Sequence, residues 1–116
     1  TAAFGLHGAL VVGPPVALTA DNRAAVAAAL PAFALQLRRG ETLVDTGVGA
    51  NVLGSPALAL AHLARVVATQ PWAPPLAAGE VITTGTVTDA WPVAPGETWT
   101  SDYGALGVAG LAVTFT

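Results

Sequence analysis

The sequence predicts a β-rich α+β fold with one main helix over about residues 55–69. Three observations support this prediction. Several β-branched or apolar stretches are bounded by Gly and Pro, a pattern typical of short strands. Only one segment combines a strong helix start with helical spacing of its apolar residues. No repeat, linker or shift in composition divides the 116 residues, so we expect residues 1–116 to form a single domain.

The N-terminal part of the chain predicts one strand and one short helix. Residues 8–12 are apolar and precede Gly13-Pro14-Pro15, which cannot continue a ladder because proline has no N–H. Residues 20–30 are rich in Ala, which favours a helix, and they contain Asp21 as a candidate N-cap. Pro31 marks the end of this short helix.

An antiparallel hairpin is expected next. Residues 32–38 and 42–46 have the composition of strands and flank Arg39-Gly40-Glu41, whose glycine suits a tight turn. Residues 47–51 read Gly-Val-Gly-Ala-Asn and predict a flexible loop that leads to the main helix.

The main helix begins at Ser55-Pro56, because serine is a good N-cap and proline suits the first helical position. Apolar residues at helical spacing continue to about Thr69, before a proline-rich break at residues 71–75. His62 lies inside this helix among Leu and Ala, so a structural or interface role is favoured for it. Beyond the break we expect three more strands, at residues 80–86, 98–102 and 108–115.

The composition predicts that much of the surface of this chain contacts other protein. Hydrophobic residues make up 53% of the chain and charged residues only 9%, whereas typical domains carry about 25% charged residues. A surface with so few charges predicts a homo-oligomer, or a chain that forms part of a larger domain.

Charge and composition also exclude several classes of function. The net charge is −3 and there is no basic patch, which argues against nucleic-acid binding. The chain has no Cys, so it forms neither disulfides nor thiolate metal sites. No apolar run reaches about 18 residues, so we expect no membrane span and a cytoplasmic protein.

The candidate binding motif is Thr84-Gly85-Thr86, at the end of a β-branched run. Two hydroxyls and a glycine that lets a ligand approach the backbone can hold a small carboxylate or 2-oxo acid. The alternative is a plain strand-terminal turn with high β propensity.

Three further residues are candidates for a pocket. Gly49 and Asn51 lie in the loop before the Ser55 helix, whose free N–H groups favour anions; the alternative is a simple loop with a helix cap. His7 is a minor candidate near the start of the first strand. No residue is assigned a catalytic role, because the chain has no Gly-x-Ser-x-Gly motif and no Cys.

A set of motifs in a fixed order carries a family resemblance. They are Arg39-Gly40-Glu41, the run Gly47-Val48-Gly49-Ala50-Asn51-Val52-Leu53-Gly54-Ser55-Pro56, then Gly79-Glu80-Val81-Ile82, Thr84-Gly85-Thr86, Pro95-Gly96-Glu97 and Asp102-Tyr103-Gly104. In this order and spacing, over nearly the whole chain, they resemble the C-terminal part of the fumarylacetoacetate hydrolase superfamily, and within it the 2-keto-4-pentenoate hydratase / 4-oxalocrotonate decarboxylase branch. The resemblance implies a mixed β-roll or sandwich that is the C-terminal part of a larger catalytic domain.

The resemblance also implies a chemistry. Members of the branch are lyases of aromatic meta-cleavage catabolism that act on 2-hydroxy-dienoates or related 2-oxo acids, with Mg²⁺ or Mn²⁺ held by three carboxylates that include a Glu-x-Glu pair. By resemblance, Thr86 contacts the carboxylate or carbonyl of the substrate. The resemblance also implies a catalytic lysine in the hydratases. This chain has neither a Glu-x-Glu pair nor a Lys, so we expect no complete metal site within it. A second chain, or another part of the same gene product, would carry the metal.

Two alternatives stay open at this point. The chain could be a non-catalytic binding or assembly module with the same scaffold, which its low charge and three Trp residues fit. It could also belong to an acylpyruvate hydrolase, because the hydratases more often have Ser-Gly-Ser where this chain has Thr84-Gly85-Thr86.

Overall fold

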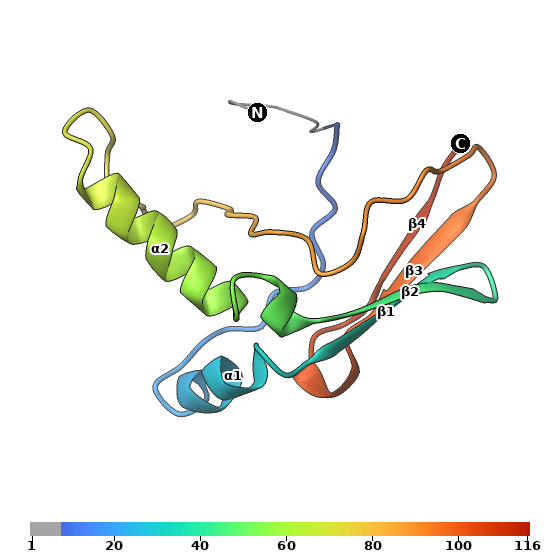
Figure 1. Cartoon of the computed structure of the whole chain (residues 1–116), viewed down its shortest axis with the longest axis horizontal. Coiled ribbons are helices and arrows are strands. Elements are labelled where there is room, and N and C mark those ends of the chain that lie inside the picture. Colours follow the sequence, from blue (N-terminus) through green and yellow to red (C-terminus); the bar gives the residue numbers. More distant parts are fainter. Residues whose placement is uncertain (1–7) are drawn as a thin grey trace.

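A computed structural model describes residues 8–116, and it contains one antiparallel sheet and one main helix. The strands are β1 (Ala34–Arg39), β2 (Thr42–Val48), β3 (Thr98–Asp102) and β4 (Leu111–Thr114), in the spatial order β2-β1-β3-β4. The helices are α1 (Arg23–Ala29) and α2 (Pro56–Ala68), with short 3₁₀ turns η1 (Gly49–Asn51) and η2 (Gly104–Leu106). The sheet occupies one end of the molecule, and α2 extends away from it at the other (Figure 1). The predicted α+β class is confirmed.

The sheet is built on the predicted hairpin. β1 and β2 pair antiparallel on either side of Gly40, which has a φ of 54°, a left-handed conformation that glycine adopts without strain. β3 then pairs with the other side of β1, and β4 completes the sheet beside β3. The ladder is irregular between Leu37 and Arg38, where the register of β1 against β2 shifts by one residue.

The core of the described residues is small. Its buried apolar side chains are Phe33, Leu35, Val52 and Trp99. Leu37 of β1, Trp99 of β3 and Val113 of β4 line the same side of the sheet and give it one largely apolar face. A core of this size stabilises a domain only weakly, since stabilisation follows the apolar area removed from water.

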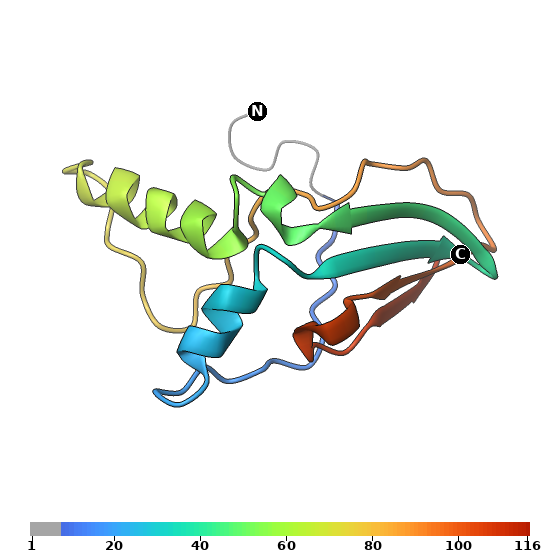
Figure 2. The ribbon, with the colours of Figure 1, turned by 60° about the horizontal axis from the view of Figure 1, so that its bottom comes forward.

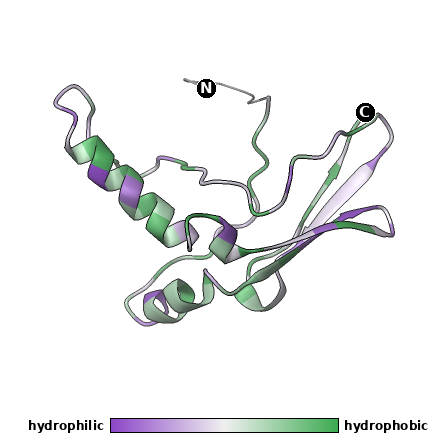
Figure 3. Ribbon diagram, viewed as in Figure 1, coloured by the Kyte–Doolittle hydropathy of each residue, from purple (hydrophilic) through white to green (hydrophobic). Residues whose placement is uncertain are grey.

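The main helix α2 begins as predicted. Ser55 is the N-cap, and its Oγ accepts a hydrogen bond from the N–H of Ala57 at 3.3 Å, while Pro56 occupies the first turn. None of the 13 residues of α2 is buried. Its apolar side chains Leu58, Leu60, Leu63 and Val66 are exposed. In Figure 3, α2 is mostly green, the colour of hydrophobic residues, with hydrophilic bands between.

The stretch Gly49–Ala68 is long and apolar enough to cross a membrane by length and composition alone. Its backbone is not a single helix, because it turns at Leu53 and Gly54, whose φ values are 48° and 82°. The continuous helix α2 has 13 residues, about 20 Å at the usual rise, which is shorter than the ~30 Å hydrocarbon core of a bilayer.

Two predicted strands are absent from the described residues. Residues 8–12 and 80–86 lie in extended or irregular conformation without a ladder partner, so both predictions were wrong. Their β-branched residues fit a strand, but a strand forms only where a neighbouring backbone is available. Both segments leave large apolar side chains in solvent, including Val12 and Val81.

Several element boundaries also needed correction. The first helix spans Arg23–Ala29 rather than residues 20–30, and its N-cap is Asn22 rather than Asp21. β2 extends through Gly47 and Val48, and the remainder of the predicted loop forms the turn η1. The last strand is shorter than predicted and comprises Leu111–Thr114.

Candidate functional site

A polar pocket lies where β2 ends, beside the segment that contains Thr86. Its volume is about 320 Å³. It is lined by Asp45, Thr46, Asn51, Thr86, Val87, Thr88 and Asp89. Two of the residues predicted from the sequence, Asn51 and Thr86, therefore lie in one pocket although 35 positions separate them in the chain.

Glycine allows the two sides of this pocket to approach each other. A Cβ on Gly47 would overlap the backbone carbonyl oxygen of Val87, so only glycine fits at this point of β2. Figure 2 shows the segment before β3 running beside β2. Gly49 also permits a close approach, but to a different part of the chain. A Cβ on Gly49 would overlap the carbonyl oxygen of Leu30 and the ring of Phe33.

Asn51 ties the two sides together. Its Nδ2 donates a hydrogen bond to the carbonyl oxygen of Val87 at 2.9 Å. The turn η1, which follows β2 directly, places Asn51 at this position. The side chain thus holds the residue that follows Thr86, and the pocket forms between them.

Asp45 makes a second set of bonds across the pocket. Its Oδ2 accepts hydrogen bonds from the indole Nε1–H of Trp91 at 3.0 Å and from the backbone N–H of Asp89 at 3.1 Å. Its Oδ1 accepts from the N–H of Thr46 at 2.7 Å. The bond from Trp91, followed by the one from Asp89, lowers the pKa of Asp45 below its ordinary value, because both favour the ionised carboxylate.

The other predicted site residues lie elsewhere. Gly49 is buried against Phe33 and does not line the pocket. Thr84 and Gly85 are exposed and lie outside the pocket, and a Cβ on Gly85 would make an ordinary contact of 3.7 Å with Val52. His7 lies outside the described residues. His62 is exposed on α2.

Sequence reasoning missed the pocket residues on β2. Asp45 is one of seven carboxylates in the chain, and its Oδ2 accepts hydrogen bonds from residues 44 and 46 positions away. A hint existed in the sequence: Asp45 interrupts a strand of β-branched residues, where aspartate is disfavoured. The partner, however, could not be identified without the fold.

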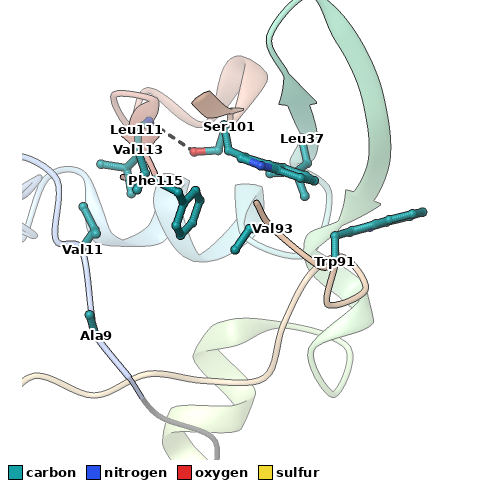
Figure 4. Close-up of a pocket in the computed structure, with 10 residues that line it drawn as sticks. Ala9, Val11, Leu37, Trp91, Val93, Ser101, Leu111, Val113 and Phe115 are labelled. Carbon is teal, nitrogen blue, oxygen red and sulfur yellow. Dashed lines mark hydrogen bonds between the residues drawn. The ribbon is translucent and has the colours of Figure 1, made fainter. Parts of the chain in front are cut away.

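A second, apolar hollow of about 460 Å³ lies on the sheet (Figure 4). Its walls are Ala9, Val11, Leu37, Trp91, Val93, Trp99, Ser101, Leu111, Val113 and Phe115. Ser101 supplies the one side-chain hydroxyl of this lining, and it accepts a hydrogen bond from the N–H of Leu111 at 3.2 Å. The hollow therefore offers apolar contact and very little hydrogen bonding.

Residues 8–116 do not provide a ligand set for a metal ion. Hard cations such as Mg²⁺ need clustered oxygen ligands. Residues 8–116 contain no group of three or more His, Asp or Glu side chains that could hold a metal ion. The polar pocket itself has two carboxylates, and one of them, Asp45, is already engaged by Trp91.

The antiparallel sheet and the capped helix α2 form an α+β fold with a polar pocket where β2 meets the turn η1. Residues 1–114 match the family described as fumarylacetoacetate (FAA) hydrolase C-terminal, and the chain belongs to this family.

Two similar proteins are named for their enzyme activities. The chain is 45% identical over 69 residues to the 4-oxalocrotonate decarboxylase of Pseudomonas sp. (strain CF600), which covers 60% of this chain and 25% of the relative. It is 40% identical over 74 residues to the 2-oxo-hept-4-ene-1,7-dioate hydratase of Escherichia coli, which covers 64% of this chain and 27% of the relative. The aligned region thus spans about a quarter of the length of each relative.

Proposed function

We propose that this chain is the C-terminal part of a metal-dependent lyase, a hydratase or decarboxylase that acts on 2-hydroxy-dienoate or 2-oxo acid intermediates of aromatic meta-cleavage catabolism. The observation that carries the proposal is the polar pocket that brings Thr86 and Asn51 together. The family and the two relatives, a decarboxylase and a hydratase, support the same class of chemistry.

The role of this chain is to bind and orient the substrate. The hydroxyl of Thr86 donates a hydrogen bond to a carboxylate or carbonyl oxygen of the 2-oxo acid, and Asn51 fixes the backbone beside it through the bond to Val87. The lining of this pocket has no Arg but two carboxylates, Asp45 and Asp89, so this chain offers the substrate neutral donors and no positive charge.

The metal ion, Mg²⁺ or Mn²⁺, is held by residues outside this chain, because residues 8–116 provide no ligand cluster for it. The metal-bearing part is a second chain or another part of the same polypeptide, within a cytoplasmic oligomer. The apolar side chains exposed on α2 and on residues 8–18 provide contact area for it.

Turnover of a 2-hydroxy-2,4-dienoate by the assembled enzyme tests this proposal. Thr86→Val keeps the shape of the side chain and removes its hydroxyl, so we expect kcat/KM to fall by about 10²-fold, in line with the loss of a hydrogen bond to a charged group. Thr42→Val, at the exposed start of β2, is the matched control and should retain full activity. Equal kinetics of the two variants would remove Thr86 from the site.

One observation favours an assembly module as the second candidate. The helix α2 has no buried residue, and a helix with four exposed Leu or Val side chains is well suited to bind another protein. Under this alternative, the assembled protein would turn over neither a dienoate nor an acylpyruvate, and chelation of divalent metals would change nothing. Turnover of the acylpyruvate alone would instead assign the hydrolase activity.

A further inference from the structure

The segment from residue 81 to residue 93 is held in place by side chains. Among residues 8–116, its backbone makes no hydrogen bond with another backbone group. Its hydrogen bonds with the described residues go to Asn51 and Asp45 alone. Since no ladder fixes this segment, those two side chains determine where Thr86 lies.

We propose that Asp45 is a positioning residue, whose carboxylate holds residues 86–91 against β2 so that Thr86 faces the pocket. This inference rests on the proposed function, because it assigns Asp45 to the same site. Asp45 acts through the segment and does not itself contact the substrate.

The geometry of the carboxylate suits this role. The N–H of Thr46 orients Oδ1 at 2.7 Å, on the same strand as Asp45. That bond leaves Oδ2 directed at the segment, where it accepts from Asp89 and Trp91 together. Hydrogen bonds to an ionised acceptor are about twice as strong as neutral ones, so a single carboxylate can substitute for a missing ladder.

Trp91 extends the effect to the apolar hollow. Its indole N–H is bound by Asp45, while its ring forms part of the wall of the hollow with Leu37 and Val93 (Figure 4). Trp91 is 44% exposed, so packing alone does not fix the orientation of its ring. The carboxylate therefore orders a wall of the apolar hollow as well as the polar pocket.

The surroundings keep Asp45 ionised near neutral pH. The other titratable group that lines the pocket is Asp89, which meets Asp45 through its backbone N–H. The remaining lining residues are uncharged: Thr46, Asn51, Thr86, Val87 and Thr88. The hydrogen bonds from Trp91 and Asp89 hold the pKa of Asp45 below its ordinary value, so the bonds persist across the physiological range.

Amide hydrogen exchange of the assembled enzyme tests the proposal directly. In Asp45→Asn, which keeps the size of the side chain and removes its charge, we expect the amide of Asp89, the one backbone N–H of residues 86–91 with a hydrogen-bond acceptor among residues 8–116, to exchange about tenfold faster or more. The matched control is Asp102→Asn. The carboxylate of Asp102 lies outside the pocket, and it accepts a hydrogen bond of 2.7 Å from the backbone N–H of Gly104. This control should leave exchange at residues 86–91 unchanged.

Trp91→Phe provides a second variant that leaves the carboxylate in place. It keeps an aromatic ring and removes one donor, so exchange at residues 86–91 should rise less than in Asp45→Asn. In the same two variants, we expect KM for the dienoate to rise about tenfold with a smaller change in kcat, because the loss concerns the placement of the pocket.

If exchange at residues 86–91 is unchanged in both Asp45→Asn and Trp91→Phe, the positioning role of Asp45 is overturned, regardless of how turnover responds. Faster exchange in Asp45→Asn but not in Asp102→Asn supports it. An unsubstituted enzyme that lacks lyase turnover would instead overturn the proposed function, and the exchange measurement would still decide whether Asp45 holds the segment.

Discussion

Two indoles in this chain donate to carboxylates at the same distance, and their surroundings differ sharply. Trp99 lies in β3, is 7% exposed, and donates its Nε1–H to Glu97 at 3.0 Å. Trp91 lies in the segment before β3, is 44% exposed, and donates to Asp45 at 3.0 Å. The first bond is one contact among many in a paired sheet, whereas the second is one of three hydrogen bonds that hold a segment without a ladder.

The same hydrogen bond from an indole to a carboxylate has different consequences in the two regions. Around Trp99, the pairing of β3 with its neighbours and the guanidinium of Arg39, 5.8 Å from the ring centre, keep the indole in place without Glu97. Around Trp91, neither packing nor a ladder replaces Asp45. We therefore expect the loss of the Trp99 ring to act mainly on global stability, and the loss of the bond between Trp91 and Asp45 to act mainly on local order at the pocket.

The largest effect expected from this comparison is on global stability. Trp99→Ala removes a buried aromatic ring from the sheet and should cost about 3–5 kcal/mol of unfolding free energy. Trp91→Ala removes a half-exposed ring and should cost about 1 kcal/mol. Urea unfolding of the two variants measures both values, and equal losses would contradict the distinction between the two regions.

A substitution at Gly47 tests the contact between β2 and the segment that contains Thr86. Gly47→Ala places a methyl group where the carbonyl oxygen of Val87 lies, so the segment must move away from β2. We expect a loss of about 1–3 kcal/mol, typical of overpacking, together with faster amide exchange at residues 86–91. Gly8→Ala, which meets open space, is the control and should stay within about 0.5 kcal/mol of the unsubstituted protein.

The smallest expected effect is the response to acid. Hydrogen bonds from Trp99 and Ala94 lower the pKa of Glu97, as those from Trp91 and Asp89 lower the pKa of Asp45. Both carboxylates bind a proton less readily when folded, so their contributions are complete above the unfolded pKa values of about 4 and are lost as the pH falls through the lower folded values.

The two indole N–H resonances, followed by NMR from pH 7 downward, measure this response. Both should shift only below about pH 4. Glu97→Gln should abolish the titration seen at Trp99 and leave that at Trp91 intact, and Asp45→Asn should do the reverse. A resonance that titrates near neutral pH would contradict the assigned partners.

The sequence predicted those elements whose cause is local. The hairpin follows from a glycine between two strand-forming runs, and α2 follows from Ser55-Pro56, so both were found close to their true bounds. Residues 80–86 have equally strong β propensity and still form no strand among the described residues. Propensity states that a segment fits a sheet, and only the tertiary structure supplies the neighbouring strand.

The candidate site shows the same limit. Of the motif Thr84-Gly85-Thr86, Thr86 lines the polar pocket, whereas Thr84 and Gly85 lie outside it, and the role of Thr86 in substrate binding stays a prediction. The hydrogen bonds that build the pocket join residues 36 to 46 positions apart. Contacts at this separation depend on the packing of β2 against a distant segment, which leaves no periodic pattern in the sequence.

The segment held by Asp45 and Asn51 has one more consequence, for solubility. β2 is an edge strand of the sheet, and edge strands invite pairing with other chains unless a loop, a charge or a bulge covers them. Residues 86–91 run beside β2 (Figure 2) and are held there by Asp45 and Asn51, so they act as a guard against edge-to-edge aggregation. Variants that release the segment should precipitate at protein concentrations at which the Asp102→Asn control remains dissolved.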